Sequence, residues 1–519
     1  MSPLYGRGLS TLSAALEKYD QSQSQFAQFI ARQTGCGGWS GWRLPCGCSI
    51  WTRGLWEDEA LTILVARQPL IRLFSILSSA DVHPPLYFLL VKIFMSLGQS
   101  EFVIRLPSAL CSAAAVGVLY LLGRDMFDER VGLVGALLMA VSPLQLLYAQ
   151  EARMYAQLLL LAGLSGWTFF HAWSSQGWRW WILFTVSAAV ACYTLTLFFP
   201  LFLAMTLYVG LVERSRERIW RFGLARLPCG RVILTLAGCF IFAKSFSSWP
   251  LSLSLLLFWI VTPHPLILLT TLSGFFVGIS LPAFGTAVSL GVTLLIIFVV
   301  LNSVRHALIA ESGDKQALIW LLLWAFVPLL GLYLISLIRP IFQLRTVMLA
   351  SLPLYLLLSW GVTCAARKRF NQWLLLPTLF MMSLSLYNFY FDPVYAKPPW
   401  REAAAYVRDH AQPGDVAIHT SEGSYLPFLV YNSIMEQVRL QEPEAPDSSR
   451  SQTIISAVAS AGQSIEAATR GRQRAWLILG LDRAIEFQLA QKDYFNHSYT
   501  LLREMEIEGI YISEYSLRK

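Results

Sequence analysis

The chain has 519 residues, of which 55% are hydrophobic and 14% are charged, and its mean hydropathy is +0.52. Soluble globular domains carry about 25% charged residues, so this composition excludes an ordinary soluble protein and indicates a membrane protein. The formal net charge of +8 does not indicate a nucleic-acid partner, because the basic residues are spread over short connections between apolar runs.

Residues 1–54 form an atypical N-terminal segment without a convincing membrane span or signal peptide. We interpret this segment as a degenerate first helix or as an extension. Three cysteines cluster in it, but no fourth ligand lies at a spacing used by zinc sites, so we interpret them as ordinary thiols. These cysteines are Cys36, Cys46 and Cys48.

Residues 55–391 form the predicted membrane body. A helix needs about 20 apolar residues to cross a hydrocarbon core of about 30 Å, and such runs recur here. The single runs are Leu106–Gly123, Val131–Gln150, Met154–Trp173, Val232–Trp249, Phe284–Val304, Gln316–Ile338, Thr346–Ala366 and Gln372–Phe391. The uncharged stretch Trp178–Val212 is too long for one crossing and is interpreted as a tight pair of short spans. We therefore expect a polytopic α-helical membrane protein with about 10–11 transmembrane helices.

The positions of the basic residues predict which connections face the cytosol. Arginine and lysine gather in alternate short connections, for example between Arg214 and Arg231, as the positive-inside rule requires of cytoplasmic loops. The other connections then face outward. They are the region before Leu106, the turn around Glu151, the segment Arg339–Arg345 and the chain after Phe391. This topology predicts an integral plasma-membrane protein with an extracytoplasmic C-terminal part.

Residues 392–519 are predicted to form a small extracytoplasmic α/β domain, because charge density rises after Asp392. A helix over Arg401–His410, a Pro-Gly turn and a strand over Asp415–His419 are expected first. The later elements are a strand over Ala475–Leu479, a helix over Asp482–Lys492 and strands within Tyr499–Tyr515. None of the eight cysteines lies beyond Cys364, so no disulfide is expected in this domain.

Two groups of ionisable residues lie early in the chain at the predicted outer boundary, where charged side chains are costly and therefore candidates for function. The segment Glu57–Glu59 offers a general base, with one pKa raised by mutual repulsion; the alternative is a solvated helix start. His83 precedes Pro84 and Pro85, where it could contact a phosphate oxygen, a metal or a proton; the alternative is a proline-marked turn.

Two further groups lie at the same boundary. Glu151 and Arg153 occupy a tight outward turn, where they could orient a sugar and a phosphate or simply pair with each other. Arg339 and Arg345 place two guanidiniums opposite the carboxylates, and guanidinium is well suited to clamp phosphate; the alternative is interfacial snorkelling. Because all four groups share one predicted face, we expect them to form one site.

Several segments, taken in order, carry a family resemblance. They are LWEDEALT (Leu55–Thr62), HPPLYFLL (His83–Leu90), EFVIRLPSAL (Glu101–Leu110), SPLQLLYAQEARMYA (Ser142–Ala156), TLSGFFVG (Thr271–Gly278) and PPWREAAAYVRDHAQPGD (Pro398–Asp415). In this order they resemble the dolichyl-phosphate-mannose protein mannosyltransferase-like family of GT-C glycosyltransferases, including bacterial members that use undecaprenyl-phosphate sugars. The resemblance implies a GT-C-like membrane body.

The resemblance also implies roles for individual residues. Asp58 corresponds to the catalytic base, with Glu59 assisting, and Glu151 to the acid of the second outer loop. His83 falls where relatives contact the lipid phosphate, and Arg339 or Arg345 where they place phosphate-binding arginines. We count Arg105 and Arg153 as further candidate substrate- or phosphate-binding residues. Some relatives use a divalent metal, which this sequence does not require. Relatives often have a histidine after a Tyr-Thr pair, where this chain has Leu195, and this difference counts against identical chemistry.

These observations predict a glycosyltransferase that moves a sugar from a polyprenyl-phosphate carrier to an acceptor hydroxyl at the outer membrane face, with inversion. The expected partners are this donor, the bilayer and an acceptor protein, lipid or glycan, and no nucleic acid is expected. A transporter or lipid flippase is the first alternative, although it would favour ionisable residues at mid-membrane and an inverted repeat. An inactive scaffold that presents the C-terminal domain is the second.

Overall fold

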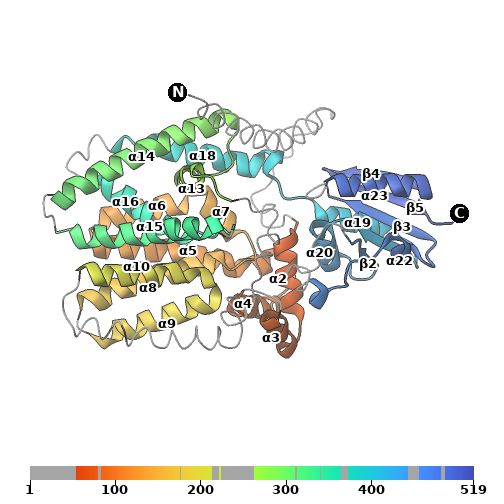
Figure 1. Ribbon diagram of the computed structural model, residues 1–519, viewed down its shortest axis with the longest axis horizontal. Helices are drawn as coiled ribbons and strands as arrows, with labels where there is room; N and C mark the ends of the chain where they lie inside the picture. Colours follow the sequence, from red (N-terminus) through yellow and green to blue (C-terminus); the bar gives the residue numbers. More distant parts are fainter. Residues whose placement is uncertain are drawn as a thin grey trace, which may run out of the picture.

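The computed structural model describes residues 54–79, 83–175, 177–212, 221, 223, 262–309, 313–338, 340–363, 372–441, 455–480 and 485–518. Within these residues, a helical body and a smaller α/β domain occupy opposite ends of the molecule (Figure 1). Three short helices lie between them: α2 (Glu57–Arg67), α3 (Leu70–Ser79) and α4 (Leu86–Met95). The span predicted at Val232–Trp249 and the cysteine cluster of the N-terminal segment lie outside the described residues.

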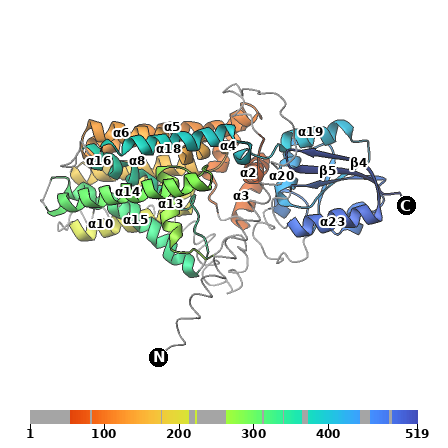
Figure 2. The ribbon, with the colours of Figure 1, turned by 90° about the horizontal axis from the view of Figure 1, so that it is seen from above.

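The body consists of apolar helices that lie side by side in both ribbon views (Figures 1 and 2). Its helices are α5 (Glu101–Met126), α6 (Glu129–Ala140), α7 (Pro143–Ala149), α8 (Tyr155–Ser174), α9 (Trp178–Thr194), α10 (Phe199–Val212), α13 (Leu266–Phe276), α14 (Ala283–Ile309), α15 (Lys315–Ile338), α16 (Ser351–Thr363) and α18 (Leu375–Phe391). Three described helices are long and apolar enough to cross a membrane, namely α5, α14 over Gly285–Ile309, and α15. The described chain is therefore a polytopic helical membrane protein.

Most predicted spans coincide with helices, and the pair expected within Trp178–Val212 is present as α9 and α10. The span predicted over Val131–Gln150 corresponds to α6 and α7 together, which pass as one apolar stretch but meet at a bend of 63° that the sequence did not predict. The bend lies at Ser142–Pro143, where proline has no N–H to continue the hydrogen bonding of α6 but starts a new helix readily. After this bend, the connection that follows α7 lies against α2, where the N–H of Ala152 donates to Glu59.

The α/β domain contains a five-stranded sheet in the order β2-β1-β3-β5-β4. Its strands are β1 (Val416–His419), β2 (Glu436–Arg439), β3 (Arg474–Leu479), β4 (Thr500–Ile507) and β5 (Ile510–Ser516). Strand β1 pairs parallel with β2 and β3, whereas β5 pairs antiparallel with β3 and β4. The predicted strands are confirmed at β1, at β3 and in the terminal hairpin.

Helices α19 (Trp400–His410) and α23 (Ile485–Ser498) cover opposite faces of this sheet (Figure 2). Side chains of a strand alternate between its two faces. Trp476 of β3 therefore packs with Ala403 on the α19 side, while the next residue, Leu477, packs with Phe495 on the α23 side. Both helices overlap the helices predicted from the sequence, and the sheet has an apolar core on each face.

Helix α20 (Glu422–Tyr431), strand β2 and helix α22 (Ile465–Thr469) were not predicted. Gly423 and Pro427 lie within α20 and disfavour a helix, which is why the sequence pattern does not reveal it. Tyr425 and Leu426 of α20 pack on Ala60 and Leu64 of α2. The α/β domain is thus seated directly on the helix that carries Asp58 and Glu59.

Gly278 ends the TLSGFFVG segment in a conformation that only glycine adopts readily, with φ of 112°. A Cβ atom there would lie 2.3 Å from Ser385 Oγ and 2.7 Å from Pro143 Cγ. We expect Gly278→Ala to lower the thermal unfolding temperature of the purified protein measurably. Gly291→Ala is the matched control, because a Cβ at Gly291 meets nothing within 4 Å and the residue lies in a helix. An unfolding temperature that falls equally in both variants would contradict the proposed close contact at Gly278.

Candidate active site

The three acidic residues at positions 57–59 open α2, where carboxylates interact favourably with the helix N-terminus. Successive residues of a helix point about 100° apart, so Asp58 and Glu59 face different surroundings. The side chain of Glu59 has no exposed surface, whereas that of Asp58 retains 27% exposure. This difference assigns the two neighbours to different parts of the site.

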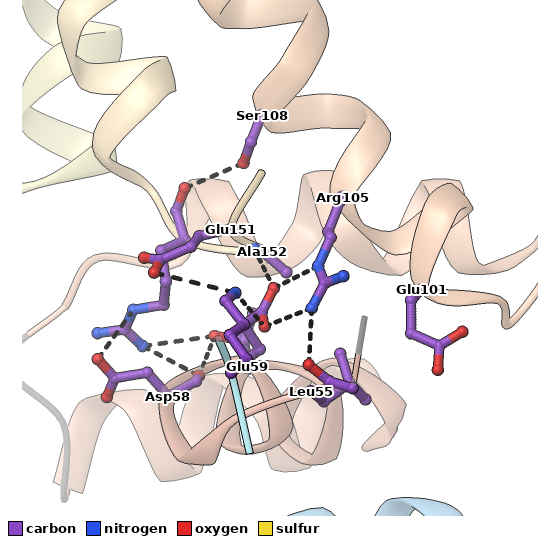
Figure 3. Close-up of polar contacts among 12 residues, drawn as sticks. Leu55, Asp58, Glu59, Glu101, Arg105, Ser108, Glu151 and Ala152 are labelled. Carbon is purple, nitrogen blue, oxygen red and sulfur yellow. Dashed lines mark hydrogen bonds and ion pairs between the residues drawn. The ribbon is translucent and has the colours of Figure 1, made fainter. Parts of the chain in front are cut away.

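Glu59 lies at the centre of a buried cage of hydrogen-bond donors (Figure 3). Arg105 of α5 donates from Nε and Nη2 to the two carboxylate oxygens, each at 2.7 Å. The backbone N–H of Ala152 donates at 3.0 Å and Lys397 Nζ at 2.9 Å. Burial raises the pKa of Glu59, but Lys397, Arg105 and the hydrogen bonds outweigh it and lower the pKa to about 2. Glu59 is therefore ionised at neutral pH and joins four separate parts of the chain.

Asp58 faces a second pair of cations. Arg345 Nη1 donates to Asp58 Oδ2 at 2.8 Å, and Arg153 Nε lies 4.0 Å from the same oxygen. Gln343 orients the guanidinium, because its Oε1 accepts from Arg345 Nε at 2.6 Å. Burial raises the pKa of Asp58, but the charges of Arg153 and Arg345 outweigh this effect and hold the pKa below its ordinary value. Asp58 is thus a partly accessible carboxylate beside a guanidinium.

Glu151 follows α7 and is buried close to both of these groups. Lys397 Nζ lies 4.0 Å from Glu151 Oε1. Burial raises the pKa of Glu151 to about 7, since the carboxylates of Glu59 and Asp58 add to the effect and Lys397 and Arg153 only partly oppose it. Glu151 therefore changes charge near neutral pH, which is the range that acid–base catalysis uses.

The structure brings together six of the eight predicted site residues. They are Asp58, Glu59, Arg105, Glu151, Arg153 and Arg345. His83 lies just before α4, close enough to help lower the pKa of Asp58, while Arg339 lies outside the described residues. Arg105, predicted to bind substrate, donates hydrogen bonds to the carboxylate of Glu59 and to the Gly54 carbonyl oxygen, and these contacts give it a structural role.

Lys397 is the member of this site that sequence reasoning missed. It lies between the last helix of the body and α19, where no motif marks it; the available signal was its position directly before the segment Pro398–Asp415. With Lys397 the site holds four cations against three carboxylates. The cations are Arg105, Arg153, Arg345 and Lys397, and the carboxylates are Asp58, Glu59 and Glu151.

The charged side chains of this site fit an anion better than a metal ion. Among the described residues, no group of three or more His, Cys, Asp or Glu side chains is arranged to hold a metal. Asp58 and Glu59 are each paired with cationic side chains, and the excess of positive charge suits a phosphate. Guanidinium beside a carboxylate at the edge of an apolar helical body can hold an anionic leaving group next to a base.

This fold is shared with membrane glycosyltransferases of the GT-C class. ArnT from Cupriavidus metallidurans, solved in the apo state and bound to undecaprenyl phosphate, matches in both structures with a TM-score of 0.60 and 12% identity. Each match covers 95% of this chain and 98% of ArnT. An oligosaccharyltransferase from Archaeoglobus fulgidus, in complex with Zn and sulfate, matches with a TM-score of 0.50 and 14% identity over 89% of this chain and 69% of that one. At these identities the likeness shows the fold alone.

Residues 82–242 match the family described as dolichyl-phosphate-mannose-protein mannosyltransferase. This partial match and the shared GT-C fold agree with the resemblance to the dolichyl-phosphate-mannose protein mannosyltransferase-like family that the sequence motifs suggest. A comparison with curated protein sequences gave no match. The family resemblance inferred from the sequence is therefore supported over residues 82–242, and the chain is an integral membrane protein with the GT-C fold.

Proposed function

We propose that this protein transfers a sugar from a polyprenyl-phosphate carrier to an acceptor hydroxyl at the outer face of the plasma membrane, with inversion at the anomeric carbon. The observation that carries the proposal is the pair formed by Asp58 and Arg345, 2.8 Å apart. A candidate base and a candidate phosphate ligand, 287 positions apart in the sequence, meet at a partly exposed point. The carrier is suggested by the fold of ArnT, which has been solved with undecaprenyl phosphate bound.

The pairing of Asp58 with Arg345 suggests how donor binding would prepare the base. A lipid phosphate competes for the guanidinium of Arg345, because Arg binds phosphate in the same forked geometry as carboxylate. Once Arg345 turns to the phosphate, Asp58 loses one of the two guanidinium charges that hold its pKa low and becomes a better proton acceptor. Binding of the donor and activation of the base are then one event.

The chemical step follows from this arrangement. The acceptor oxygen attacks the anomeric carbon, the bond from that carbon to the phosphate oxygen breaks, and the acceptor proton passes to Asp58. Arg345, with Arg153 nearby, stabilises the charge that gathers on the leaving phosphate. Glu151 and His83 border the same space and would position the sugar or the acceptor. Attack on the face opposite the phosphate gives inversion.

The outer location rests on the distribution of charge. Basic connections alternate along the chain, and the connections that carry Asp58, Glu151 and Arg345 are those that the positive-inside rule places outside. The donor geometry agrees with this location, since a polyprenyl chain lies in the bilayer and presents its phosphate and sugar at the interface.

The test is a transfer assay in lipid nanodiscs. The purified protein is given undecaprenyl phosphate carrying radiolabelled hexoses or pentoses, together with a cell-envelope extract as the source of acceptors. We expect free undecaprenyl phosphate to appear with at least one sugar, and the label to move to an acceptor. In proteoliposomes, movement of the intact donor between leaflets without its cleavage would instead support a flippase and contradict the proposal. Binding of donor with neither event would favour a scaffold.

A further inference from the structure

Lys397 belongs to the segment between α18 and α19 rather than to the helical body, yet its side chain is only 16% exposed. Its ammonium group lies 2.9 Å from Glu59 Oε2 and 4.0 Å from Glu151 Oε1. The ring of Trp56, just before α2, lies 5.9 Å from the same nitrogen, which adds a weaker cation–π attraction. The segment thus delivers one cation into the space between two acids.

The α/β domain fixes the path of this segment. Tyr431 Oη, at the end of α20, donates to Glu101 Oε1 at 3.0 Å and accepts from the backbone N–H of Leu55 at 2.8 Å. Arg401, in the first turn of α19, donates to the same Glu101 oxygen at 3.3 Å. Glu101 opens α5, one turn before Arg105, so the anchor of the α/β domain and the cage of Glu59 share one helix.

We propose that Lys397 is a positioning residue through which docking of the α/β domain sets the charge facing Glu151. Docking on α2 and α5 brings Lys397 between Glu59 and Glu151; undocking withdraws it. The proposal rests on the proposed function, because Glu151 acts there on the sugar or the acceptor. It gives the α/β domain a role in the chemistry, exerted through the segment that leads into α19.

The charges around Glu151 determine the sign of the effect. From α2 it faces Asp58 and Glu59, from α7 Tyr148, and from its own connection Arg153. Lys397 is the cation that comes from the segment leading to the α/β domain. Removal of its ammonium group leaves two neighbouring carboxylates opposed by Arg153, so Glu151 holds its proton to a higher pH.

The experiment compares pH profiles of kcat/KM for transfer in the wild type and in Lys397→Met. We expect the acid limb of the profile to lie near pH 7 in the wild type, where burial places the pKa of Glu151. In Lys397→Met this limb should move upward by about one pH unit, which lowers the rate on the acid side about tenfold. Lys397→Arg keeps the charge and should restore most of the profile, and Glu151→Gln should remove the limb altogether.

Two more variants distinguish the effect of domain docking from the effect of the Lys397 charge itself and from a general loss of a surface lysine. Tyr431→Phe removes the hydrogen bond to Glu101 without touching Lys397, and it should move the acid limb in the same direction by a smaller amount. Lys492→Met, which removes a lysine paired with Glu504 on the α/β domain, should leave the limb in place. A rate that falls equally at every pH in Lys397→Met, with no shift of the limb, would overturn the proposal. A limb unmoved by Tyr431→Phe would overturn the role given to docking.

A second readout keeps this proposal separate from the proposed function. Infrared difference spectra report the protonated carboxyl of Glu151 without any turnover, and Glu151→Gln identifies its band. Absence of transfer in the wild type would sink the proposed function alone. The Lys397 proposal then stands if the midpoint of the Glu151 band rises in Lys397→Met, and fails if the midpoint is unchanged.

Discussion

Asp58→Asn is expected to abolish transfer, with a fall in kcat of about 10²–10⁴-fold, the usual contribution of a general base. Asparagine has nearly the same shape as aspartate and can still accept a hydrogen bond from Arg345, but it cannot accept a proton. The release of undecaprenyl phosphate in nanodiscs measures the loss. An unchanged unfolding temperature shows that the fold is retained.

Asp409→Asn is the matched control for this variant. Asp409 lies on α19 with 63% of its side chain exposed, and the same substitution there should leave both activity and stability unchanged. Near-wild-type activity in Asp58→Asn would eliminate Asp58 as the base and would transfer that role to Glu151.

Arg105→Met is expected to have the largest effect on stability. It removes both guanidinium hydrogen bonds from the fully buried carboxylate of Glu59 and leaves Lys397 as the remaining cation of the cage. Loss of one partner from a buried ion pair costs about 3–5 kcal/mol, because the other charge stays buried. Thermal or denaturant unfolding in detergent, followed by tryptophan fluorescence, measures this loss.

A second variant distinguishes the unpaired charge from the lost packing of the arginine. Glu59→Gln combined with Arg105→Met removes both charges, so the double variant should be more stable than Arg105→Met alone. Arg408→Met, at an exposed position on α19, should cost little. If the double variant is less stable than Arg105→Met alone, then Arg105 does not stabilise the fold by neutralising the buried charge of Glu59.

The same cage predicts a dependence of stability on pH. Glu59 has its pKa lowered from 4.5 to about 2 in the folded chain, so its contribution to stability is complete above pH 4.5. This contribution is lost as the pH falls from 4.5 through 2, where the folded state must also take up the proton.

Much of the fold was predictable because membrane spans, loop charges and strand alternation are local patterns. The bend between α6 and α7 was missed because the run Val131–Gln150 remains apolar through Ser142 and Pro143. Hydropathy alone does not reveal a change in the direction of the helix axis. Helix α20 was missed because Gly423 and Pro427 mask its periodicity. Its stability comes instead from packing on Ala60 and Leu64, which are over 360 positions away in the sequence.

The sequence predicted most residues of the candidate site. It did not predict which of them are buried and structural and which are accessible to a substrate. Asp58 and Glu59 are adjacent in the sequence and equally acidic, and only the direction of α2 decides that one is caged and the other accessible. Lys397 was missed because its one sequence signal, the place directly before Pro398–Asp415, does not reveal the two acids that its side chain approaches in the folded chain. The charge state of Glu151 likewise depends on burial, which the sequence does not give.

The central claim is that Arg345 exchanges Asp58 for the phosphate of a polyprenyl carrier. An experimental structure of the protein with bound undecaprenyl phosphate tests this claim most directly. The claim predicts a phosphate oxygen about 2.7–2.9 Å from the guanidinium of Arg345, with the carboxylate of Asp58 released toward the position of the sugar. A phosphate bound elsewhere, with Arg345 still hydrogen-bonded to Asp58, would contradict it.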